Sequence, residues 1–118
     1  MAPPDTSGLA DGTAIVEVNV PGVLSPQARM GERAFNAECA ACHGANAAGN
    51  KGQGPPLVHR IYEPGHHSDM AFVLAAKNGV RAHHWRYGNM PPVSGVTDAD
   101  VKAITAYVRA LQKENGIF

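Results

Sequence analysis

The sequence predicts an all-α protein with three main helices joined by long loops, preceded by a short strand-like extension at the N-terminus. Apolar residues recur with helical spacing in three segments, which two long stretches rich in glycine and proline separate. The chain has 118 residues, of which 44 % are hydrophobic. This length and composition fit one small domain with a modest core.

The charge balance argues against two classes of partner. Ten basic and ten acidic side chains cancel, whereas binding to nucleic acid or to an anionic membrane surface needs a basic excess. No apolar run approaches the roughly 20 residues that cross a bilayer. We therefore expect a soluble protein that binds no nucleic acid and has no membrane span.

Residues 1–24 form an extension before the first helix. Residues 1–12 are rich in Pro, Gly, Asp and Ser, which predicts a flexible tail, and they lack the apolar core of a signal peptide. In residues 13–20 (TAIVEVNV) small apolar side chains take every second position, which predicts a strand that Pro21 and Gly22 end. Since no second strand follows, this one must pair locally, lie along the helices or meet another chain. We expect a monomer, with a dimer through this strand as the alternative.

The first helix begins after Ser25, a favourable N-cap that Pro26 follows at the first helical position, and it continues through QARMGERAFNAECAACH. Residues 44–67 then form an irregular stretch with several glycines and prolines. A structureless loop of this length is unusual in a small domain. It is explained if the loop wraps a ligand rather than packing only on protein.

Two further helices complete the domain. The second begins at Ser68 and ends at Asn78–Gly79, a pair suited to a C-cap. Residues 80–96 are again irregular. The last helix begins at Thr97, with acidic residues in its first turn, and ends near Gly116. Its apolar face is formed by Val101, Ile104, Val108 and Leu111.

The only two cysteines, Cys39 and Cys42, stand directly before His43. A zinc site needs four ligands, usually two such pairs, and a redox dithiol needs a strand before it rather than a helix. Cys-x-x-Cys-His is instead the signature of covalent haem attachment. Two thiols one helical turn apart can reach the vinyl groups of a porphyrin, and the next residue offers its imidazole to the iron. The motif thus favours one c-type haem per chain, held through two thioethers, over zinc or a dithiol.

We predict Met90 as the second axial ligand of the iron. It lies in the loop GNMPPV, where Pro91 and Pro92 stiffen the backbone that must hold a weak, flexible thioether. Met30 and Met70 fall within predicted helices, where packing is the more common role. An open site or a histidine ligand is the alternative, the histidines being His59, His66, His67, His83 and His84.

The segments GERAFNAECAACHG, GPPL, KNG, NMPP and DADVKAITAYVRAL follow one another as in class I bacterial c-type cytochromes, the small soluble monohaem cytochromes c. The chain resembles this family from Ser25 to Leu111. The resemblance implies the cytochrome c fold around one covalently bound haem, with residues 25–118 as the haem domain. It also implies that the first and last helices cross near Gly31 and Tyr107.

Carried over by position, the resemblance implies how the haem is bound. Cys39 and Cys42 form the thioethers, while His43 and Met90 are the axial metal ligands. The carbonyl of Pro55, in GPPL, accepts the imidazole N–H and raises the basicity of the ring.

Trp85 corresponds to an aromatic residue that packs on the haem edge and donates to a propionate. The pairs His66–His67 and His83–His84 are solvated loop residues or further propionate partners, in which case the reduction potential depends on pH. Five cations fall in segments expected to surround the haem: Lys51, Arg60, Lys77, Arg81 and Arg86.

The resemblance implies electron transfer by a protein that is not an enzyme. The haem iron exchanges one electron during brief contacts with redox partner proteins. A periplasmic location is implied, because haem is attached to such proteins after export. The alternatives are a gas-binding or sensing haem protein with a labile Met90 ligand, and the haem module of a larger oxidoreductase complex.

Overall fold

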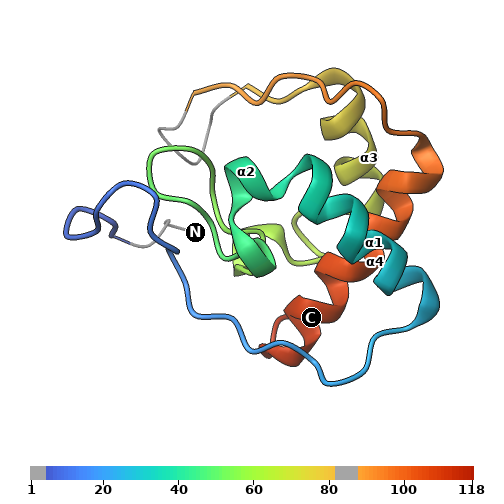
Figure 1. The fold of residues 1–118 in the computed structure, drawn as a ribbon, viewed down its shortest axis with the longest axis horizontal. Helices are drawn as coiled ribbons and strands as arrows, with labels where there is room; N and C mark the ends of the chain where they lie inside the picture. Colours follow the sequence, from blue (N-terminus) through green and yellow to red (C-terminus); the bar gives the residue numbers. More distant parts are fainter. Residues whose placement is uncertain (1–4, 82–87) are drawn as a thin grey trace.

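Helices are the only regular structure in residues 5–81 and 88–118, the parts of the chain that the computed structural model describes (Figure 1). In chain order these are α1 (Pro26–Glu38), α2 (Ala40–His43), the 3-10 turns η1 (Ala45–Ala47) and η2 (Arg60–Tyr62), α3 (Asp69–Asn78) and α4 (Asp98–Glu114). The all-α prediction is therefore confirmed. None of these helices is long and apolar enough to span a membrane.

Side-chain caps set the starts of three helices where the sequence predicts them. The Ser25 hydroxyl before α1 and the Ser68 hydroxyl before α3 each accept a backbone N–H of the first turn, at 3.1 and 3.3 Å. Thr97 and Asp100 form a capping box at the start of α4. These caps satisfy backbone donors that have no partner within the helix.

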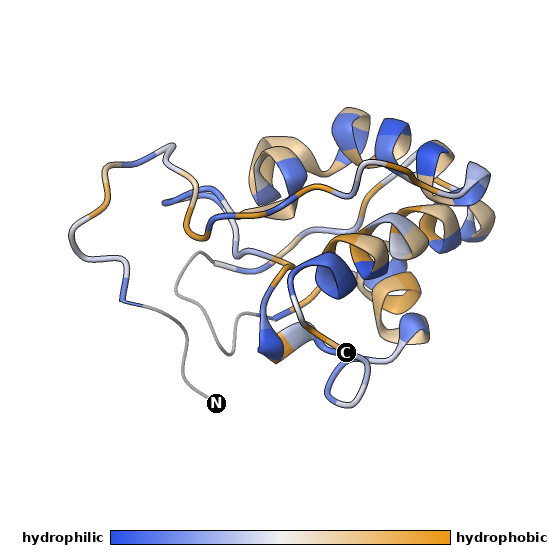
Figure 2. Ribbon diagram, turned by 90° about the horizontal axis from the view of Figure 1, so that it is seen from below, coloured by the Kyte–Doolittle hydropathy of each residue, from blue (hydrophilic) through white to orange (hydrophobic). Residues whose placement is uncertain are grey.

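α1 and α4 cross in close contact at the centre of the core. Gly31 of α1 makes the approach possible, since a Cβ at this position would overlap the Ala103 carbonyl and lie 2.8 Å from Ile104 N. Phe35 and Tyr107 fill the adjoining space, with ring centroids 5.6 Å apart and planes tilted by 56°. The helical ribbons carry both hydrophobic and hydrophilic residues, as amphipathic packing requires (Figure 2). The crossing implied by the family resemblance is present.

The segment predicted as one helix up to His43 is divided at Cys39, whose φ of −120° and ψ of −29° are not helical. Backbone hydrogen bonds continue across the division, from Cys39 N to Phe35 O at 2.8 Å and from His43 N to Cys39 O at 2.9 Å. The prediction of one continuous helix is wrong at this residue. Helix propensity carries no signal for such a bend, because each residue here is tolerated within a helix.

Residues 13–20, predicted as a strand, do not form one. Ile15 N and Val16 N both donate to the same carbonyl, that of Ala48, at 3.0 and 3.1 Å. A strand needs a neighbouring edge that presents alternating donors and acceptors, whereas here one loop carbonyl serves both residues. The strand prediction is wrong because alternation indicates a half-buried extended chain and not whether a second strand lies beside it.

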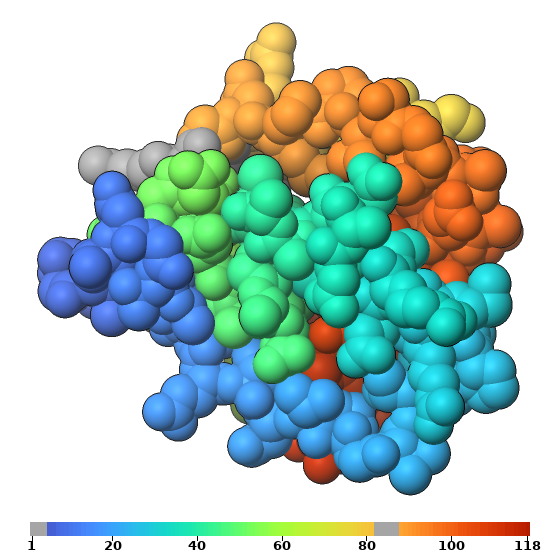
Figure 3. Space-filling view, viewed as in Figure 1, coloured from blue at the N-terminus to red at the C-terminus, as the bar shows by residue number. Residues whose placement is uncertain are grey.

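The N-terminal segment (residues 5–24) instead lies along the helical domain, where it crosses the surface as one continuous strip (Figure 3). Val18 and Leu24 pack against the core. Asn19 N donates to Asn115 Oδ1 at 2.9 Å, and Asn115 Nδ2 donates back to Asn19 O at 2.8 Å. The segment therefore links the loop that follows α2 to the residues that end α4.

Tyr107 is expected to weaken the fold at high pH. Burial, with Glu32 nearby, raises the pKa of its phenol from 10.0 to about 12. Below pH 10.0 the phenol keeps its proton in both the folded and the unfolded protein. Above this pH the unfolded chain releases the proton first, so the free energy of unfolding decreases until the pH reaches the pKa of the folded state. We expect this group to cost roughly 1 kcal/mol between about pH 10 and about pH 11, and Tyr107→Phe to remove this part of the pH dependence. Urea denaturation from about pH 8 to about pH 11 checks this; equal pH slopes in the two proteins would contradict it.

Candidate haem-binding site

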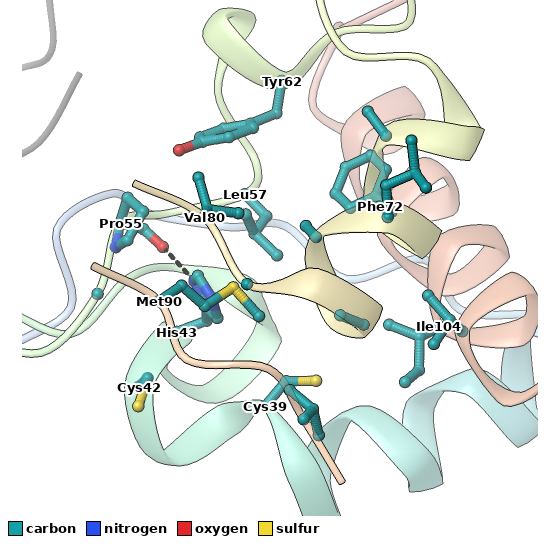
Figure 4. Close-up of a pocket in the computed structure, with 18 of the residues that line it drawn as sticks. Cys39, Cys42, His43, Pro55, Leu57, Tyr62, Phe72, Val80, Met90 and Ile104 are labelled. Carbon is teal, nitrogen blue, oxygen red and sulfur yellow. Dashed lines mark hydrogen bonds between the residues drawn. The ribbon is translucent and has the colours of Figure 1, made fainter. Parts of the chain in front are cut away.

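A largely apolar cavity of ≈ 460 Å³ lies between helices α1 to α4 and the loops that join them (Figure 4). Hydrophobic side chains from separate parts of the chain form its wall, among them Phe35, Leu57, Phe72, Val80, Val93 and Ile104. Cofactor pockets in proteins measure roughly 300–1,000 Å³ and are lined in this way. Described residues from both long irregular stretches contribute to its wall, for example Leu57 from the first and Val93 from the second.

Both cysteines of the motif line this cavity, and they are not bridged to one another. Cys39 is half-buried, while Cys42 is exposed. Burial raises the pKa of the Cys39 thiol to about 11, and the nearby Glu38 and Cys42 add to the effect. Cys39 is therefore a protonated thiol at neutral pH, and both cysteines that thioether bonds require belong to the wall of one cavity.

His43 also lines the cavity, and the Pro55 carbonyl orients its ring (Figure 4). The distance from His43 Nδ1 to Pro55 O is 2.8 Å. Because a carbonyl oxygen can only accept, Nδ1 carries the proton and Nε2 keeps its lone pair. Desolvation lowers the pKa of the imidazole, although the bond to Pro55 acts in the opposite direction. The ring is thus held in the neutral form that metal ligation needs.

The attachment loop (residues 44–55) joins His43 to its hydrogen-bond acceptor. Gly49 N donates to His43 O at 2.7 Å. Gly54 lies directly against α2, since a Cβ there would overlap the Cys42 carbonyl. The loop is therefore fitted to the backbone of the motif at two points.

Met90 lines the cavity as well, and two hydrogen bonds hold its backbone. Val80 N donates to Met90 O at 2.9 Å, and Met90 N donates to Val80 O at 2.8 Å. Gly79 allows this close pairing, because a Cβ there would lie 2.6 Å from Met90 O and 3.1 Å from the Pro92 ring. The loop that carries Met90 is thus fixed to the end of α3 in addition to being stiffened by its prolines.

The other candidate ligands occupy different places. Four of them do not line the cavity: Met30, Met70, His59 and His66. Met30 and Met70 are 58 % and 55 % exposed. His67 does line the cavity. The predictions for His83–His84 and Trp85 fall outside the described residues.

Tyr62 and His67 form a polar part of the cavity wall, with their ring centroids 4.8 Å apart. The distance from His67 Nδ1 to Ile61 O is 2.6 Å, so this ring is anchored to the loop that carries it. A haem carries two carboxylates, and polar side chains such as these are among the groups in the described wall suited to receive them, together with Arg81.

Arg109 and Gln112 of α4 hold this polar part in place, and neither was predicted. Arg109 Nη1 donates to Tyr62 O at 2.6 Å, and Nη2 donates to His67 O. Gln112 Nε2 donates to the carbonyls of Leu57 and Tyr62, both at 2.9 Å. The sequence did contain a signal for these two residues, because Arg109 and Gln112 directly follow Val108 and Leu111 of the apolar face of the last helix.

The cations expected around the haem do not form one group. Arg81 lines the cavity. Lys51 is turned toward the N-terminal segment, with its Nζ 2.9 Å from Thr6 O and 3.2 Å from Thr6 Oγ1. Arg86 lies outside the described residues.

Three comparisons with known proteins agree with this geometry. The Cytochrome c family model matches residues 28–112. Over 90 residues the chain is 38 % identical to the Cbb3-type cytochrome c oxidase subunit CcoP of Rubrivivax gelatinosus; the match covers 73 % of this chain and 27 % of that relative. The chain thus spans about a quarter of the length of this curated relative. Cytochrome CL from the marine methylotrophic bacterium Methylophaga aminisulfidivorans matches with a TM-score of 0.56 and 25 % identity, over 91 % of this chain and 73 % of that chain.

The described residues also fit the group that such proteins carry. The cavity is largely apolar, and two unbridged cysteines and a neutral imidazole from adjoining parts of the chain belong to its wall. The chain belongs to the cytochrome c family and is a small c-type cytochrome, which transfers electrons through a covalently attached haem.

Proposed function

We propose that this chain is a one-electron carrier in which His43 and Met90 are the two axial ligands. The observation that carries the proposal is that both residues line one apolar cavity while separate hydrogen bonds fix each of them, His43 to Pro55 and Met90 to Val80. Two ligands that are held independently keep their places in both oxidation states. Little reorganisation then accompanies electron transfer.

Each residue of the site has a distinct role in this proposal. When bound, haem supplies an iron that takes up and releases one electron. Cys39 and Cys42 tether the ring through thioethers, and the Pro55 carbonyl makes the His43 imidazole a stronger donor. The soft sulfur of Met90 favours the reduced state, and so does the apolar wall, since added positive charge is costly in a low dielectric.

The remaining features follow from the role of a carrier. Residues 25–118 form the haem domain and residues 1–24 its extension. The protein performs no catalysis, works as a monomer in the periplasm and meets its redox partners in brief contacts. The likeness to an oxidase subunit supports a second candidate function, that of a haem module within a larger oxidoreductase complex.

Met90→Ala tests the ligand assignment. We expect the ferrous variant to bind CO readily and its reduction potential to fall by on the order of 100 mV, within the roughly 0.8 V range that axial ligands span. Met70→Ala is the matched control, because Met70 is 55 % exposed on α3 and does not line the cavity. Should Met70→Ala open the site to CO while Met90→Ala leaves it closed, the assignment would be wrong.

A further inference from the structure

The attachment loop contains two residues in a backbone conformation that residues other than glycine seldom adopt. Asn46 and Ala47 have φ angles of 57° and 56°. Residues other than glycine rarely hold such angles unless the surrounding structure enforces them. The loop nevertheless determines where the Pro55 carbonyl lies relative to His43 Nδ1, so its support matters for the site.

Four backbone hydrogen bonds from the N-terminal segment provide support from outside the loop. Gly12 N donates to Lys51 O at 2.9 Å, and Lys51 N donates to Thr13 O at 2.9 Å. Further along, Ile15 N and Val16 N donate to the Ala48 carbonyl. These bonds span the middle of the attachment loop.

Side chains strengthen the same contact. A Cβ on Gly49 would lie 2.9 Å from Ile15 Cδ1 and 2.8 Å from Pro56 N, so Ile15 packs on the loop where it turns toward Pro55. Gly49 is also the residue whose N–H holds the His43 carbonyl. Lys51 Nζ donates to the carbonyl and the hydroxyl of Thr6, so the contact between the loop and the N-terminal segment extends to Thr6.

We propose that the N-terminal segment is a positioning element for the haem ligand His43. By holding the attachment loop, it keeps the Pro55 carbonyl at hydrogen-bond distance from Nδ1 and thereby keeps Nε2 electron-rich. This inference rests on the proposed function, because it concerns His43 as an iron ligand. It also gives the N-terminal segment a role within its own chain, because the backbone N–H groups of Gly12, Ile15 and Val16 donate to carbonyls of the attachment loop.

The predicted consequence is a change at His43 when the support is weakened. If the Pro55 bond opens more often, the Nδ1 proton exchanges faster with solvent. The imidazole also becomes a weaker donor, so the oxidised state loses stabilisation and the reduction potential rises. Met90 is held by Val80, outside this contact, and its spectroscopic signature should remain.

The test uses the haem-loaded full chain and the substitution Ile15→Pro, which removes one donor to Ala48 and the side chain that covers Gly49. Nuclear magnetic resonance of the ferrous protein follows the exchange of the His43 Nδ1 proton in deuterated buffer. We expect exchange to accelerate by about tenfold and the potential to shift upward. Val23→Pro is the matched control, because Val23 belongs to the same segment and is 81 % exposed; it should change exchange by less than about twofold.

The double variant Ile15→Ala with Lys51→Met keeps the proposal testable if Ile15→Pro does not fold. It removes the packing on Gly49 and the link to Thr6 but introduces no proline. Unchanged exchange and potential in haem-loaded variants would overturn the positioning role and leave the proposed carrier function intact. Absence of covalently bound haem from the unmodified protein would overturn both.

Discussion

Gly31→Ala is expected to destabilise the haem-loaded protein by about 3 kcal/mol or more. The added methyl group would overlap the carbonyl of Ala103 and approach Ile104 N, and both are backbone atoms that cannot rotate away. Alanine gains about 1 kcal/mol of helix propensity over glycine, which is too little to offset the overlap. α1 and α4 must therefore separate, and Ile104, which lines the cavity, must move with α4.

Urea denaturation of Gly31→Ala beside Gly22→Ala measures this effect. Gly22 has no atom within 4 Å of the position of an added Cβ, so the same substitution there should change stability by less than about 1 kcal/mol. Equal losses of unfolding free energy in the two variants would show that the crossing of α1 and α4 tolerates a side chain at residue 31, which would contradict the close approach of Gly31 to Ala103.

Arg109→Leu is expected to cost about 3 kcal/mol, because one half-buried guanidinium serves several acceptors. Its side chain is 16 % exposed and donates to Tyr62 O, His67 O, Gln112 Oε1 and Asp69 Oδ1. It also lies 4.9 Å from the centre of the Phe72 ring, which lines the cavity. Leucine fills much of the space but leaves the two carbonyls without these donors.

Two further substitutions separate the carbonyl contacts from the ion pair. Asp69 is 74 % exposed, so Asp69→Asn should cost less than about 1 kcal/mol. Arg109→Lys retains the charge but not the fork of donors, and an intermediate loss of about 1–2 kcal/mol is expected. If Asp69→Asn proved as harmful as Arg109→Leu in thermal unfolding, the ion pair and not the loop carbonyls would be the main contribution.

Local signals predicted the helices well because their causes are local. Ser25, Ser68 and Thr97 each cap the helix that follows, and a short polar side chain before an apolar periodic segment is enough to indicate this. The close crossing at Gly31 came from the family resemblance, since a single glycine in a helix does not by itself say which element approaches it.

The features that were missed depend on partners distant in sequence. Two such features are the bridge between Val80 and Met90 and the bonds from Arg109 to a loop about 40 residues earlier in the chain. The hydrophobic periodicity of a sequence does not predict which segments come into contact. The strand expected in residues 13–20 failed for the same reason, because its partner is the carbonyl of Ala48 and not a second strand.

Within the site, sequence reasoning singled out Cys39, Cys42, His43, Pro55 and Met90, all of which line the cavity, but not how they are supported. The bond between His43 and Pro55 has the geometry expected from the resemblance, and Met90 lies at the cavity as expected. Their roles toward the iron stay predictions, as does that of Trp85.

An absorption spectrum of the purified haem-loaded protein, ferric and then ferrous, before and after addition of CO, reports directly on whether His43 and Met90 both ligate the iron. Ligation by His43 and Met90 predicts a weak far-red band in the ferric state and no response of the ferrous state to CO, because both axial positions are filled. A spectrum without the far-red band and with a ready shift on adding CO would contradict the account and favour a gas-binding haem protein.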